Sequence, residues 1–279
     1  MDKSIKATLK AATDKLKSIS DSPALDAELL LAHCLDKNRT YLHTWPEKVL
    51  STKQQHCYSK LINKRLTDYP VAYLLGEKAF WSLDLIVTPD VLIPRPETEL
   101  LVELALEKVT NIHQPKILDL GTGSGAIALA IASERTNADI YASDFSLKAL
   151  DIAKKNAIKN QLSNNLTFIQ SSWLNDIVER DFDLILSNPP YINPTDPHLL
   201  ETIRFEPRSA LVAKNKGLND IKIIIQHAKS HLKQGGFLII EHGFDQAEQV
   251  LQLFQKNGFK NEKNQRDLNK TPRVSYAQN

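Results

Sequence analysis

The stretch 116-KILDLGTGSG-125 is a short apolar run followed by three glycines at every second position, and a second apolar run, 126–132, comes directly after it. The first run predicts a buried strand and the second a helix, so the glycines fall in the turn between them. Glycine adopts positive φ without strain and lets a ligand approach the backbone closely. The stretch therefore predicts the first strand, loop and helix of a nucleotide-binding α/β sheet.

Strands and helices continue to alternate after this unit. Further strands are predicted at 138–143, 166–170, 182–186, 237–241 and 272–277, and further helices at 146–160, 218–232 and 247–256. Gln234-Gly235-Gly236 is predicted as a turn before the fifth strand. This order predicts a doubly wound α/β domain, whose ligands bind beyond the carboxyl ends of the strands.

The first third of the chain has a different pattern. Residues 1–74 show apolar residues at helical spacing and contain no glycine, which predicts a compact helical bundle. Residues 75–96 include a period-two run at 80–87 and several prolines, which predicts a strand within a β-hairpin linker. A helix then begins near Thr98, with Thr98 or the Pro96-Glu97 pair as its cap. We predict three parts: 1–74, 75–96 and 97–279.

Composition excludes several classes of protein. The net charge of +2 gives no overall field for nucleic acid, and no secretory leader or bilayer-spanning run is present, so we expect a cytoplasmic protein. The eight histidines are scattered, and Cys34 and Cys57 lack metal-like or redox spacing. We expect no metal, and we expect the two cysteines to be small buried residues.

Two acids accompany the glycine loop. Asp144 ends the second predicted strand, where an acid can hydrogen-bond a ribose diol. Asp119 stands two residues before Gly121, where it would repel a pyrophosphate but suit a cation. The acids and the GxGxG spacing favour S-adenosyl-L-methionine over NAD, with a purely structural turn as the alternative. Trp173 follows the third strand and can either stack on an adenine or pack beneath a helix.

A second loop, Ser187-Asn188-Pro189-Pro190-Tyr191, follows the strand at 182–186. Its two prolines end the strand and stiffen the loop. The strands at 116–120 and 182–186 are neighbours at the switch point of a doubly wound sheet, so this loop should face the glycine loop. The Asn188 side-chain oxygen and the Pro189 carbonyl can accept both N–H groups of a planar amine, and Tyr191 can pack on it. Catalysis would then rest on positioning and preorganised dipoles, whereas the alternative is a mere strand-ending turn.

The Asn-Pro-Pro-Tyr loop resembles that of amino-group methyltransferases, which act on exocyclic amines of bases and on glutamine amides. Further motifs resemble the peptide chain release factor glutamine methyltransferases (the PrmC/HemK family), and the resemblance covers essentially the whole chain. These motifs are Ile93 to Glu99, Arg204 to Pro207 with Ala210-Leu211, Gly235-Gly236, Glu241 to Gly243, Asp267-Leu268 and Pro272 to Val274.

The resemblance implies a Rossmann-like, S-adenosylmethionine-dependent methyltransferase domain with a seven-stranded sheet, preceded by a small helical domain that recognises the substrate protein. It implies methyl transfer to the side-chain amide nitrogen (N5) of the glutamine in the GGQ motif of class I release factors, with S-adenosyl-L-homocysteine as product. Together with the reasoning from the residues, it predicts cofactor contacts at Asp119, Gly121, Thr122, Gly123, Ser124, Gly125, Asp144, Trp173 and Asn188. Asn188, Pro189, Pro190 and Tyr191 are the predicted substrate clamp, with Asn188, Pro189 and Tyr191 catalytic.

We expect a monomer that binds neither membrane nor nucleic acid directly. The main alternative is a DNA or RNA methyltransferase acting on an exocyclic amine such as adenine N6, which should have a basic groove. A non-catalytic binding module and a NAD-dependent oxidoreductase are further alternatives. The intact loops disfavour the module, and the glycine spacing disfavours the oxidoreductase.

Overall fold

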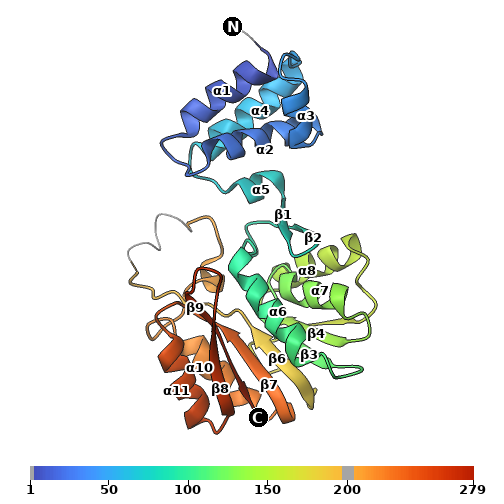
Figure 1. The fold of residues 1–279 in the computed structure, drawn as a ribbon, viewed down its shortest axis with the longest axis vertical. Helices are drawn as coiled ribbons and strands as arrows, with labels where there is room; N and C mark the ends of the chain where they lie inside the picture. The colour runs from blue at the N-terminus through green and yellow to red at the C-terminus, as the bar shows by residue number, and fades with distance from the viewer. Residues whose placement is uncertain (1–2, 197–203) are drawn as a thin grey trace. The chain divides into compact units, whose positions relative to one another are not determined.

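The computed structural model describes residues 3–196 and 204–279, and the chain forms two compact units, Met1–Glu77 and Lys78–Asn279 (Figure 1). The first unit is helical. Its helices are α1 (Ile5–Leu16), α2 (Pro23–Leu35), α3 (Arg39–Thr44), α4 (Thr52–Arg65) and α5 (Val71–Leu75). Apolar side chains from α1, α2 and α4 form one core, as the spacing in the sequence predicts.

Local signals define these helices. The Ser4 side chain caps α1, and Ser51 with Gln54 forms a capping box on α4. Arg65 Nε donates to Asp26 Oδ2 at 2.9 Å, which ties α4 to α2. Helix α5 is not predicted from the sequence, because five residues are too few to show a helical period.

The second unit contains a seven-stranded sheet in the order β5-β4-β3-β6-β7-β9-β8. Its strands are β3 (Lys116–Leu120), β4 (Asp139–Asp144), β5 (Leu166–Gln170), β6 (Phe182–Ser187), β7 (Leu232–Glu241), β8 (Lys260–Arg266) and β9 (Pro272–Gln278). The pairs from β5 through to β7 are parallel, and β9 is antiparallel to both β7 and β8. The predicted doubly wound sheet is confirmed.

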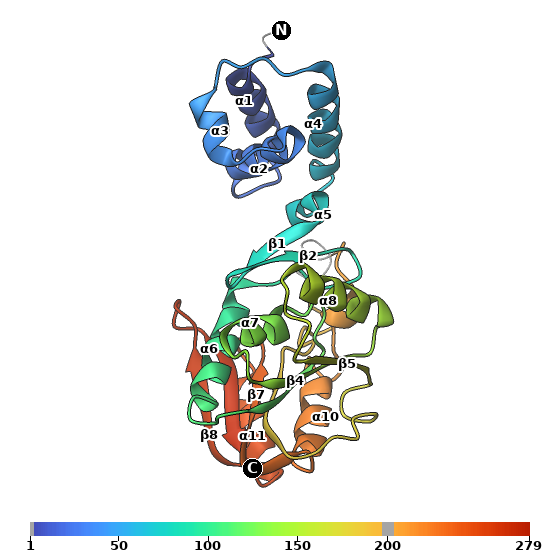
Figure 2. The same cartoon turned by 90° about the vertical axis from the view of Figure 1, so that its right-hand side faces the viewer.

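Helices cover both faces of this sheet. Helices α6 (Glu99–Lys108), α7 (Ala126–Glu134) and α8 (Leu147–Lys159) lie on one face, and α10 (Asn219–Ala228) and α11 (Ala247–Lys256) lie on the other (Figure 1, Figure 2). Side chains of β3 alternate between the two cores: Ile117 packs with α6 and α7, whereas Leu118 and Leu120 pack with α10 and α11. The site loops leave the carboxyl edge of this sheet.

The structure corrects three details of the prediction. Strand β8 is missing from the sequence pattern, because its side chains are polar and largely exposed at the sheet edge. Strand β7 begins at Leu232 and includes the glycines at 235–236, which were predicted as a turn, and α10 accordingly ends at Ala228 rather than Leu232. The chain also turns at residues 81–82, so the run at 80–87 is divided between β1 (Glu77–Phe80) and β2 (Leu83–Ile86).

Candidate active site

The glycine loop lies between β3 and α7 and needs backbone conformations that favour glycine. Gly121 has a φ of +73°, and its N–H donates to the Ser143 carbonyl at 2.8 Å. Gly125 has a φ of +84° at the start of α7, and an added Cβ would lie 3.2 Å from the Ala153 Cβ. These positions let the loop turn tightly against β4 and α8.

Asp119 lies fully buried beneath the loop. Thr122 Oγ1 donates to Asp119 Oδ2 at 2.6 Å, whereas Oδ1 has no hydrogen bond of ordinary geometry within the described residues. Burial raises the pKa of Asp119 to about 7, despite hydrogen bonds from Thr122 and the Ala128 backbone that favour the charged form. A buried acid with one unpaired oxygen favours a cation nearby.

Asp144 connects the glycine loop to the start of α8. Its Oδ2 accepts from the Gly123 N–H at 2.9 Å, and its Oδ1 accepts from the Ser146 N–H at 2.8 Å. Burial raises its pKa, and the two backbone hydrogen bonds oppose that shift. Asp144 therefore fixes the loop and presents a carboxylate at its rim.

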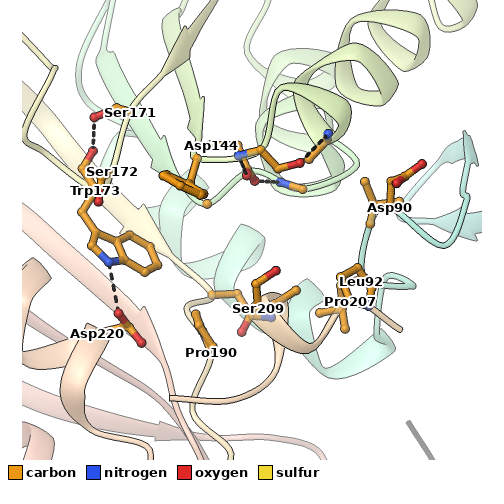
Figure 3. Close-up of a pocket in the computed structure, with 18 of the residues that line it drawn as sticks. Asp90, Leu92, Asp144, Ser171, Ser172, Trp173, Pro190, Pro207, Ser209 and Asp220 are labelled. Atoms are coloured by element: carbon orange, nitrogen blue, oxygen red, sulfur yellow. Dashed lines mark hydrogen bonds between the residues drawn. The ribbon is translucent and has the colours of Figure 1, made fainter. Parts of the chain in front are cut away.

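A cavity of about 540 Å³ opens above the two loops (Figure 3). Five predicted cofactor residues line it: Gly121, Gly123, Asp144, Trp173 and Asn188. Pro190 of the predicted clamp lines it as well. The remaining wall includes residues 89–92, Phe145, Pro207, Ser209 and Asp220, none of which is predicted as a site residue from the sequence.

Trp173 forms one wall of this cavity. Its φ is +54°, its indole lies against Gly121, and its Nε1 donates to Asp220 Oδ1 at 3.2 Å (Figure 3). The ring also packs on the core beneath. Trp173 therefore packs on the core and also borders the cavity, and its stacking on an adenine stays a prediction.

The Asn-Pro-Pro-Tyr loop leaves the end of β6 beside the glycine loop. Leu120 pairs with Ser187 across β3 and β6, and Ser187 Oγ donates to the Leu120 carbonyl at 2.7 Å. Asn188 Nδ2 donates to Thr98 Oγ1 at 3.0 Å. Thr98 was a predicted helix cap, but its side chain makes no capping hydrogen bond because its hydroxyl faces Asn188.

Both the side chain and the backbone of Tyr191 make contacts that fix its position. Its hydroxyl contacts Glu241 Oε1 at 3.4 Å, and its carbonyl accepts from Gln246 Nε2 at 3.0 Å. The backbone of Gly217 passes so close that a Cβ there would lie 1.9 Å from that carbonyl. Burial raises the pKa of the Tyr191 phenol, and the neighbouring Glu241 carboxylate raises it further. Tyr191 thus has little freedom to leave the loop.

The other predicted site residues lie deeper in the protein. Thr122 and Ser124 are almost fully buried in the glycine loop, as Asp119 is below it. Neither Pro189 nor Tyr191 belongs to the cavity lining. Their roles toward the cofactor and the substrate stay predictions.

Thr98 contacts Asn188 and Glu241 contacts Tyr191, but neither Thr98 nor Glu241 is predicted as a site residue from the sequence. Glu241 is 1 % exposed at the end of β7, and its Oε2 has no hydrogen-bond partner among residues 3–196 and 204–279. The available signal was a carboxylate at the carboxyl end of an apolar strand, two strands from β3. That signal becomes informative only when the strand order is known.

Among residues 3–196 and 204–279, no helix combines the length and apolarity needed to span a bilayer. Within the same residues, no group of three or more His, Cys, Asp or Glu side chains is arranged to hold a metal ion.

The sheet order and the two loops define the class of S-adenosylmethionine-dependent methyltransferases. Residues 96–217 match the methyltransferase small domain, and residues 7–76 match the PrmC N-terminal domain. A methyltransferase from Pyrococcus furiosus, 19% identical, superposes with a TM-score of 0.53 over 79% of this chain and 98% of its own. At that identity it supports the fold alone.

Closer relatives define the family. The release factor glutamine methyltransferase of Aliivibrio fischeri is 48% identical over 281 residues, covering 100% of this chain and 98% of its own. That of Coxiella burnetii is 47% identical, with 98% of both chains covered. The chain belongs to the release factor glutamine methyltransferase family, which confirms the resemblance found in the sequence.

Proposed function

We propose that this protein transfers the methyl group of S-adenosyl-L-methionine to the side-chain amide nitrogen of the glutamine in the GGQ motif of class I release factors. The main support is the position of the Asn188 loop at the end of β6, beside the glycine loop of β3 and on the wall of one cavity. The names of the full-length relatives support the choice of substrate. We place the reaction in the cytoplasm, with a monomeric enzyme that needs no metal.

The cavity fits the cofactor chemically. Asp119, buried beneath the glycine loop, has an unpaired Oδ1 that suits a positive ligand, and Asp144 lines the cavity with a carboxylate that would bind a ribose diol. Trp173 offers an indole edge at the cavity wall. When bound, S-adenosyl-L-methionine supplies an electrophilic methyl group on a sulfonium. Residues 121–125 would contact the bound S-adenosyl-L-methionine, and S-adenosyl-L-homocysteine would be the product.

The loop after β6 would hold the target nitrogen. The Asn188 side-chain oxygen and the Pro189 carbonyl accept its two N–H groups, and the Tyr191 ring packs on the planar amide. This arrangement would turn the nitrogen lone pair toward the methyl group, so that an N–C bond would form as the S–C bond breaks. The amide nitrogen becomes acidic as it is alkylated and then releases one proton, so no strong base is needed beforehand. Positioning and preorganised dipoles carry the catalysis.

Mass spectrometry tests the proposal. The protein is incubated with S-adenosyl-L-methionine and an unmethylated class I release factor, in parallel with unmethylated DNA. We expect one added methyl group on the GGQ glutamine and none on a factor whose GGQ glutamine is replaced by alanine. Labelled DNA with an unlabelled factor would instead support a base methyltransferase. Asn188→Ala should abolish transfer while S-adenosyl-L-methionine still binds.

A further inference from the structure

The Asn188 amide can work as a clamp only in one of its two orientations. Its oxygen must face the substrate to accept an N–H, and its NH2 group must therefore face the protein. An amide that rotates by half a turn would present two donors to a substrate that also donates. Something in the protein has to select between the two orientations.

Thr98 occupies the position that makes this selection. It is 4 % exposed at the junction of η1 (Pro96–Thr98) and α6, and its Oγ1 accepts from Asn188 Nδ2 at 3.0 Å. A hydroxyl has a single proton, so it can donate to only one partner at a time. If that proton is used elsewhere, Thr98 can only accept from Asn188.

Glu241 offers a carboxylate that can take this proton. It lies at the end of β7, where the Tyr191 hydroxyl contacts its Oε1 at 3.4 Å and its buried Oε2 has no hydrogen-bond partner among the described residues, and the nearby Thr98 hydroxyl lowers its pKa. An ionised carboxylate only accepts hydrogen bonds. A charged Glu241 therefore directs the Thr98 proton away from Asn188, and the Asn188 oxygen is left for the substrate.

We propose that Thr98 is a positioning residue that fixes the Asn188 amide with Oδ1 toward the target nitrogen, and that Glu241 keeps the Thr98 hydroxyl in its accepting role. This inference rests on the proposed function only in assigning Asn188 to the amine. It applies equally if the amine belongs to a nucleic-acid base.

The proposed arrangement of Glu241, Thr98 and Asn188 makes turnover depend on pH. Burial raises the pKa of Glu241 to about 7, and the charged and titratable groups that face it are Arg273 on β9, Tyr191 after β6 and Glu97 in η1. A protonated Glu241 can donate to Thr98, which frees the Thr98 proton for the Asn188 oxygen. Turnover at saturating S-adenosyl-L-methionine should therefore fall as the pH drops below 7.

Substitutions at Thr98 test the inference. Thr98→Val keeps the shape and removes the hydroxyl, whereas Thr98→Ser keeps the hydroxyl. We expect Thr98→Val to lower kcat at least about tenfold while the Kd for S-adenosyl-L-methionine changes less than about twofold, and Thr98→Ser to stay within about threefold of the wild type. Equal losses in both variants, or no loss in Thr98→Val, would overturn the proposal.

A second background separates orientation from general packing. Asn188→Asp presents an acceptor oxygen in either orientation, so adding Thr98→Val to it should cost less than about threefold. The same tenfold loss in both backgrounds would mean that Thr98 only supports the loop. If Asn188→Asp is inactive, two other results decide whether Thr98 orients Asn188. The first is the difference in kcat between Thr98→Val and Thr98→Ser. The second is the fall in turnover below pH 7, which Glu241→Gln should remove. Each assay uses whichever substrate the wild type methylates, so labelled DNA would refute the proposed function and still test Thr98.

Discussion

Binding of S-adenosyl-L-methionine should weaken as the pH falls from 8 to 6, because Asp119 becomes protonated. Burial raises the pKa of this carboxyl to about 7, and a neutral Asp119 no longer attracts a cation. If only the charged form binds, the apparent Kd is proportional to 1 + 10^(pKa − pH), which rises about tenfold over this range. A tenfold change corresponds to about 1.4 kcal/mol of binding free energy.

Isothermal titration calorimetry measures this dependence directly. Titrations in buffers of different ionisation enthalpy should show about half a proton released per site at pH 7, since about half of the Asp119 carboxyls are protonated before the ligand binds. Asp119→Asn is the matched variant, because it keeps the size of the side chain and cannot titrate. Any titration of the ligand itself is common to both proteins and cancels in the comparison.

The two proteins should differ in a defined way. The variant should bind more weakly at pH 8 and lack the extra tenfold change that the wild type shows. Asp144→Asn controls for the nearby acid that lines the cavity, whose pKa burial also raises, and should retain the Asp119 dependence. Parallel pH curves for the wild type and Asp119→Asn would refute the assignment of Asp119 to the cation.

Three further substitutions probe the parts that hold the two loops. Asn156 is fully buried in α8 and bonds the Ile86 N–H at 2.6 Å, the Ile86 carbonyl at 3.0 Å and the Ser124 carbonyl at 2.9 Å. Asn156→Leu should lower the free energy of unfolding in urea by roughly 3 kcal/mol, against a few tenths for the exposed control Asn164→Leu. Gly217→Ala should abolish turnover and lower the melting temperature, because its Cβ would overlap the Tyr191 carbonyl. The control Gly76→Ala, also at positive φ but with open space around it, should lower the free energy of unfolding by only about 1 kcal/mol. Near-normal turnover in Gly217→Ala would contradict the close approach of Gly217 to Tyr191. Glu206 pairs with Arg95 and accepts from the Ile93 N–H at 3.1 Å, so Glu206→Gln should loosen the cavity wall at residues 89–92 and weaken S-adenosyl-L-methionine binding a few-fold in calorimetry, and unchanged binding would show that the wall is held without the ion pair.

The sequence predicts the elements that carry a clear apolar period. Strands β3 and β6 are short, apolar and followed by glycine or proline, so their ends and the loops after them can be predicted from local physics alone. Strand β8 cannot be, because a polar edge strand is determined by its partner β9 rather than by its own side chains.

The same limit applies to the site. Asp119, Asp144 and Asn188 could be predicted as site residues because each lies within two residues of the end of a predicted strand. Thr98 could not, because its local context is that of a helix cap and only the tertiary structure turns its hydroxyl toward Asn188. Residues that act through a neighbour become visible only after distant strands are brought together.

Asp119 and Glu241 share one property that links stability to function. Each is buried with one oxygen unpaired among the described residues, and burial raises the pKa of each to about 7. Because each folded-state pKa is above the unfolded value, each acid contributes stability that is complete below about pH 4 and is lost as the pH rises through 7. Near neutral pH both charges therefore oppose folding of the free protein. At Asp119 a bound cation would remove that cost, so S-adenosyl-L-methionine should raise the melting temperature more at pH 8 than at pH 6. At Glu241, Arg273 and the Thr98 hydroxyl lower the pKa and so favour the charged carboxylate. The proposed role of Glu241 in orienting Asn188 would account for a buried charge that packing alone disfavours.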